Sequence, residues 1–89
     1  MYSLSKKTFI GFTPNYIIRG FKSGSKAVKV QRIINTVFGK KIKTLVKSGR
    51  NEIFVQVADD FCGDLFLAHL KWQLTKLKNV VSIEEIKYI

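Results

Sequence analysis

The side chains able to perform chemistry in this 89-residue chain are few, and their spacing limits what they can do. The chain has one cysteine, Cys62, and one histidine, His69. On a helix, seven residues span about two turns, or ~10 Å, which is too far for the thiolate–imidazole hydrogen bond of a nucleophilic pair. A single cysteine excludes an internal disulfide, and one cysteine with one histidine cannot complete the usual four-ligand zinc site.

Carboxylates offer a second kind of site. Asp59, Asp60 and Asp64 together could hold Mg²⁺, but aspartates that precede a helix more simply cap its N-terminus. No serine has a positioned base, and no glycine pattern matches a phosphate-binding loop. We therefore expect no catalytic residue, no metal, no cofactor and no enzymatic activity.

The positive charge of the chain is a stronger indication of function. Lysine and arginine number 16 against 6 aspartate and glutamate, which gives a net charge of +10. All six acids lie in residues 52–89, so residues 1–51 hold twelve cations and no acid. Repulsion among these cations opposes folding, and an anionic partner would relieve it. The alternative is a lysine-rich surface that only keeps the protein soluble, although solubility needs a net charge of only ~2–8.

The cations form two groups that we predict to contact the phosphates of DNA or RNA. The first group follows helical spacing and consists of Lys22, Lys26, Lys29 and Arg32. The second group belongs to a predicted hairpin and consists of Lys40, Lys41, Lys43, Lys47 and Arg50. The alternative interpretation is a solvated helix face beside a charged edge strand that discourages aggregation.

Phe54 adds an aromatic ring to the second group, because on an open sheet face it could stack on a base. Two segments, Thr8–Pro14 and Arg50–Val57, resemble the first-strand motif and the third-strand octamer of RNA-recognition-motif domains. The resemblance implies that Phe9 and Phe54 stack on bases. The octamer departs from that family at Glu52, where an aromatic residue is expected, and it lacks the family's glycines, so we assign no family. The alternative for Phe54 is a second apolar layer beneath the N-terminal segment.

The hairpin is the clearest structural unit in the sequence. Lys41–Lys47 and Glu52–Ala58 flank a four-residue turn rich in turn-forming residues. If Lys47 faces Glu52, one face of the hairpin is almost wholly apolar and consists of Ile42, Thr44, Val46, Ile53, Val55 and Val57. The opposite face is mostly polar, which is typical of a sheet with one buried face.

Two helices flank the hairpin. The first is expected from about Lys26 to Phe38, with Ser23 or Ser25 as its N-cap and Gly39 as its end. The second is expected from about Phe61 to Lys78.

Three further segments are strand-like. Tyr16–Phe21 leads into the first helix, Val80–Ile89 follows the second, and Thr8–Phe12 is an extension or a small edge strand. In the last strand the apolar residues change parity near Glu84–Glu85, which predicts a bulge. The order of elements predicts one α+β domain over residues 1–89 with a ferredoxin-like βαββαβ arrangement. This is a four-stranded antiparallel sheet with two helices on one face, and it allows an extra N-terminal edge strand.

These features together predict a small, basic, non-enzymatic nucleic-acid-binding protein. The alternative is a protein-binding regulator or inhibitor that docks on an acidic partner, as a host-takeover protein or a pro-domain would. Leu77–Glu85 is similar to the inhibitory pro-domains of subtilisin-like proteases, and Trp72 is either a core-edge residue, which we favour, or an anchor for a partner. We expect a cytoplasmic protein without a membrane span, and a free edge strand could support a homodimer.

Overall fold

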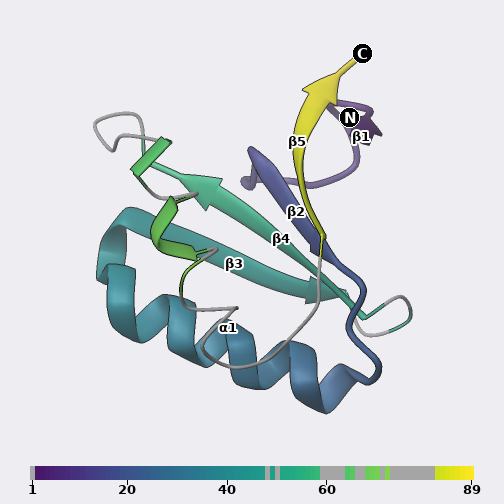
Figure 1. Cartoon of the computed structure of the whole chain (residues 1–89). Coiled ribbons are helices and arrows are strands. Elements are labelled where there is room, and N and C mark those ends of the chain that lie inside the picture. The colour runs from purple at the N-terminus through teal and green to yellow at the C-terminus, as the bar shows by residue number, and fades with distance from the viewer. Residues whose placement is uncertain are drawn as a thin grey trace.

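Five strands form one mixed sheet in the described part of the computed structural model (Figure 1). The structure describes residues 2–47, 49, 51–58, 64–65, 68–70, 72 and 82–89. The strands are β1 (Tyr2–Leu4), β2 (Tyr16–Arg19), β3 (Ile42–Lys47), β4 (Glu52–Val57) and β5 (Ser82–Tyr88). They lie in the order β1-β5-β2-β4-β3. The β1–β5 pair is parallel, and the other neighbours are antiparallel.

The protein is therefore a compact α+β domain with a five-stranded sheet and two helices, and the expectation of a four-stranded antiparallel sheet is wrong. The additional strand is β1, whose residue Tyr2 pairs with Ile86 of β5. An N-terminal edge strand is thus present, but it is not Thr8–Phe12 as expected. Residues 8–11 form bends and residue 12 is irregular, because Phe9 and Phe12 pack against the sheet face instead of extending its edge.

The β3–β4 hairpin has the predicted register. Lys47 pairs with Glu52 and Ile42 pairs with Val57, without an offset in between. Ile42, Ile53 and Val55 are buried, as the apolar alternation indicated. Of the turn, Gly49 and Asn51 are described, and Asn51 has a φ of 53°, a left-handed conformation that asparagine tolerates better than most residues.

Helix α1 (Gly24–Phe38) begins two residues before the predicted start and ends where the sequence indicated. Ser23 is the N-cap, because its hydroxyl oxygen accepts a hydrogen bond from the Lys26 backbone N–H at 3.3 Å. Gly39 follows with a φ of 61°, which ends the helix and starts the short 3-10 helix η1 (Gly39–Lys41). Figure 1 shows α1 running along one side of the sheet.

The second helix is described only in part. Residues 64–65, 68–70 and 72 are helical, and the remainder of the predicted span 61–78 lies outside the described residues. Leu70 is 1 % exposed and belongs to the same buried cluster as Val30 and Ile34 of α1. Both helices therefore pack on one face of the sheet. No described helix is long and apolar enough to cross a membrane.

The opposite face of the sheet is also covered, whereas the sequence suggested an open face. Its buried residues are Ile17, Phe54 and Ile86. The cover is the chain before β2, which packs the partly buried residues Tyr2, Leu4, Phe9 and Phe12 against them. A small second core thus forms on this face, which we call the N-terminal face.

Strand β5 contains no bulge within its antiparallel pairing with β2. The register runs without an offset from Tyr16–Glu85 to Arg19–Ser82. Ile83 packs against the helix side of the sheet, and Ile86 belongs to the core of the N-terminal face. The change of parity therefore reflects a strand covered on both faces, because each face takes one of the two isoleucines. Val80 and Val81 lie outside the described residues.

Truncation of Phe9 tests whether the N-terminal segment covers the sheet. The ring centroids of Phe9 and Phe54 lie 5.1 Å apart, so Phe9→Ala removes packing from a buried residue. We expect a loss of about 1–3 kcal/mol in the free energy of unfolding, measured in urea. Ile10→Ala is the matched control, because Ile10 is fully exposed and its truncation should stay within about 0.5 kcal/mol. Equal midpoints for the two variants would contradict this packing.

Tyr88 makes stability dependent on alkaline pH. Its hydroxyl donates a hydrogen bond to the Pro14 carbonyl oxygen at 2.6 Å, and burial raises the pKa of this hydroxyl above its ordinary value of 10.0. The neutral form is thus favoured in the folded state. Its stabilisation is complete below pH 10 and is lost as pH rises through the folded-state pKa. The difference in unfolding free energy between wild type and Tyr88→Phe should therefore shrink above pH 10, and a constant difference would contradict this.

Candidate functional site

Three cations of α1 are exposed along the part of the helix surface that does not pack on the sheet. We call Lys26, Lys29 and Arg32 the helix stripe. The opposite side of α1 buries Ala27, Val30 and Ile34 in the core. Consecutive members of the stripe are three residues apart, which is a rise of about 4.5 Å along the helix axis. Lys22 is also exposed, but it precedes the N-cap and is not part of the helix.

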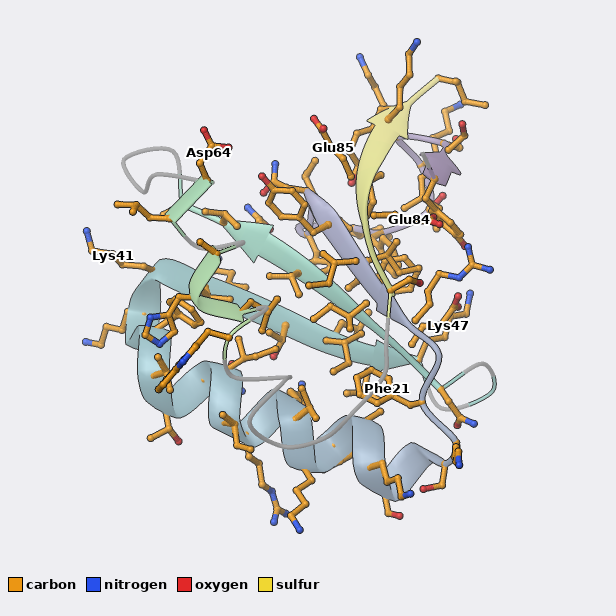
Figure 2. The ribbon with its side chains drawn as sticks, in the orientation of Figure 1. Phe21, Lys41, Lys47, Asp64, Glu84 and Glu85 are labelled. Carbon is orange, nitrogen blue, oxygen red and sulfur yellow. The ribbon has the colours of Figure 1, made fainter. Side chains whose placement is uncertain are left out.

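The remaining predicted cations do not join the stripe in one patch. Lys40 and Lys41 are exposed in η1, at the C-terminal end of α1. Lys43 and Lys47 are exposed on β3, and register places them opposite Gln56 and Glu52, on the N-terminal face. Figure 2 shows Lys41 and Lys47 at opposite ends of the hairpin. Arg50 lies outside the described residues.

Phe54 does not stand on an open surface. It is 1 % exposed, and the rings of Tyr2 and Phe9 pack edge-on against it, with centroids at 6.2 and 5.1 Å. Stacking on a base requires an accessible ring face. The prediction of Phe54 as a base-stacking residue is therefore wrong for this conformation, and the alternative of a second apolar layer is correct. Phe9, the other ring implied by the family resemblance, is part of that layer.

The helix stripe has no acidic partner among the residues that the structure describes. The ion pairs found there both belong to Arg19, whose Nε lies 3.3 Å from Glu52 Oε2 and whose Nη1 lies 3.4 Å from Glu84 Oε2. The first turn of α1 contains no acid, although the N-terminus of a helix favours negative charge. Lys26 therefore occupies a position that is unfavourable for a cation.

Arg19 and its two glutamates form a structural cluster that the sequence did not indicate. Glu52 is 5 % exposed, and its Oε1 has no hydrogen-bond partner among the described residues. The Arg19 guanidinium also lies over the Tyr2 ring, 5.4 Å from its centroid. Arg19 thus compensates a buried carboxylate and holds β1 on the sheet. The three charges come from β2, β4 and β5, so only the strand order reveals them.

A row of aromatic rings lies where α1 meets the second helix. The centroids of Phe38 and His69 are 5.3 Å apart, and those of His69 and Trp72 are 5.9 Å apart. Trp72 is 58 % exposed, so the expectation of a core-edge tryptophan is wrong. Because Cys62 lies outside the described residues, the structure does not test its predicted separation from His69.

The described part of the chain contains no cluster of metal-binding side chains. There, no group of three or more His, Cys, Asp or Glu side chains could hold an ion. Asp64 is exposed on the second helix, and Asp59 and Asp60 lie outside the described residues. The alternative of a magnesium site at these aspartates therefore stays a hypothesis.

Comparison with known proteins found no matching family model, no matching curated protein and no matching solved structure.

A single substitution should separate the structural role of Lys26 from a binding role. With Ser23 as N-cap, position 26 is the third residue of the helix, so Lys26→Glu creates a capping box. We expect a gain of about 0.5–1 kcal/mol in the free energy of unfolding at low salt. Lys29→Glu changes the charge equally beyond the first turn and should gain less. If Lys26→Glu is the less stable of the two, our account of the helix N-terminus fails.

Proposed function

We propose that this protein binds nucleic acid through phosphate contacts and that the helix stripe is its principal contact surface. One observation carries the proposal: three exposed cations follow one side of α1 without an acidic partner among the described residues. Their mutual repulsion is unfavourable in the free protein. Phosphates would relieve it and would release counterions on binding.

The spacing of the stripe suits a phosphate backbone. Lys26, Lys29 and Arg32 follow one another along α1 with a rise of about 4.5 Å per step, and their long, flexible side chains can each reach a phosphate of one strand. Lys22 and Lys40 add exposed charge near the two ends of α1. Contacts of this kind carry no base information, so we expect binding with little sequence specificity.

The ferredoxin-like arrangement is part of this proposal. It is supported by the antiparallel order β5-β2-β4-β3 and by α1, which connects β2 to β3. In such a sheet α1 lies on the outside of the domain, where its exposed side can meet a large polyanion. The chemistry of binding depends on the stripe and not on the fold type.

An acidic protein partner is the second candidate, and the edge of the sheet favours it. Strand β3 is the last strand in the order, and Leu45 between Lys43 and Lys47 is 41 % exposed. An extended acidic segment could pair with such an edge. Against this, the Gln31 amide already donates to the Thr44 carbonyl oxygen at 3.4 Å, which occupies one backbone acceptor of the strand.

Two matched pairs of substitutions test which cations meet phosphate. Lys26→Gln/Lys29→Gln removes two charges from the stripe, and Lys43→Gln/Lys47→Gln removes two from the N-terminal face. Glutamine is preferred to glutamate because a carboxylate at position 47 would face Glu52. Affinity for duplex DNA and for single strands is measured as a function of salt. The stripe variant should reduce the salt slope by about 0.7–0.9 per lost contact, depending on the strand, and the β3 variant should reduce it less.

The outcomes separate the two candidate functions. A larger effect of the β3 variant would refute the stripe as the principal surface. Undetectable binding of every nucleic acid at low salt would refute the proposed function itself. Stoichiometric recovery of one acidic protein after nuclease treatment would then favour the second candidate.

A further inference from the structure

We infer that the nucleic acid is single-stranded and that its bases stack at an aromatic end site formed by Phe38, His69 and Trp72. This inference rests on the proposed function and names its substrate class. The site lies where the C-terminal end of α1 meets the second helix. Phe38 is partly buried against the core there, whereas His69 and Trp72 are exposed.

The rings form a graded series from core to solvent. Phe38 packs against the buried cluster, His69 touches Phe38 at a centroid distance of 5.3 Å, and Trp72 touches His69 at 5.9 Å. Trp72 is 58 % exposed, and His69 is exposed as well. The inner ring thus anchors the series, and the outer rings leave aromatic surface that a base can cover.

Positive charge adjoins this aromatic end site. Lys40 and Lys41 follow Phe38 after Gly39, in η1, and both are exposed. Figure 2 shows Lys41 at the end of α1 that carries η1. The helix stripe runs toward the same end, and Arg32 precedes Phe38 by six residues, or about 9 Å along the axis. Because Phe38 points to a different side of α1 from Arg32, a strand whose phosphates follow the stripe must bend around the end of α1 to reach the rings, and a flexible single strand can do so.

Single strands and duplexes differ in whether the faces of their bases are accessible. In a duplex the bases stack on one another, so side chains cannot cover their faces without unstacking them. In a single strand the faces are open, and each base stacked on an aromatic side chain strengthens binding substantially. Cations alone would bind the phosphates of a duplex as well as those of a single strand. The ring series beside the cations is the feature that favours the single strand.

The sole tryptophan makes the test direct. Because the chain contains one tryptophan, its intrinsic fluorescence reports on Trp72 alone. Oligothymidine and oligouridine strands are titrated into the wild-type protein, alongside a duplex of the same length. We expect the single strands to quench the fluorescence at saturation and the duplex to leave it nearly unchanged. Saturable binding of a single strand without quenching would refute the aromatic end site and leave the proposed function standing.

Substitutions at position 72 supply the second measurement. Trp72→Ala should weaken single-strand affinity about 5- to 150-fold and leave duplex affinity unchanged, and Trp72→Phe should keep most of the single-strand affinity. The matched control is Ile10→Ala, which removes an exposed apolar side chain from the N-terminal segment. If Trp72→Ala does not fold, its thermal unfolding will reveal this. The fluorescence quenching of the wild-type protein then still tests the aromatic end site.

The remaining outcomes are also decisive. Equal single-strand affinity of wild type and Trp72→Ala would overturn the inference. Loss of an acidic protein partner in Trp72→Ala, with single-strand affinity intact, would assign the rings to protein binding and overturn it too. If no nucleic acid binds at low salt, the proposed function fails, and this inference fails with it.

Discussion

Strand β4 is buried on both of its faces, and the rest of the structure is arranged to satisfy that constraint. Ile53 and Val55 point to the helix side with no exposed surface, and Phe54 points to the other side with 1 %. A strand of this kind needs two covers. The two helices supply one, and the N-terminal segment supplies the other with Phe9 and Phe12. The chain before β2 is therefore part of the folded core.

This use of apolar residues determines where charge can lie. Both sheet faces are occupied near β4, so lysines and arginines are placed on the outer side of α1, on β3 and in the loops. Arg19 is the exception, since two glutamates and the Tyr2 ring surround it. Among the described residues, Arg19 thus has structural partners, whereas the helix stripe has no acidic partner. That difference separates charges that hold the fold together from charges that can meet a ligand.

The elements that depend on neighbouring residues could be predicted from the sequence, and those that depend on distant pairing could not. The β3–β4 register follows from apolar alternation around a short turn, and α1 follows from its cap and stripe of buried residues. The helix stripe could be predicted from the sequence for the same reason. Strand β1 could not, because three residues carry no periodicity and their pairing with β5 joins opposite ends of the chain. The apolar residues of β5 change parity because both of its faces are covered, and the same pattern is typical of a bulged strand. The burial of Phe54 could not be predicted, because no neighbouring residue in the sequence indicates that a distant segment lies over it.

The place of β5 between β1 and β2 has a consequence for the order of folding. Tyr2 pairs with Ile86, so forming this pair closes nearly the whole chain into one loop. The hairpin and α1 close short loops and can form early, whereas joining the two ends requires the largest loss of chain entropy. The N-terminal face should then be the last part of the protein to acquire its packing and the first to open. Local opening there would transiently uncover Ile17, Phe54 and Ile86 while the helix side remains intact.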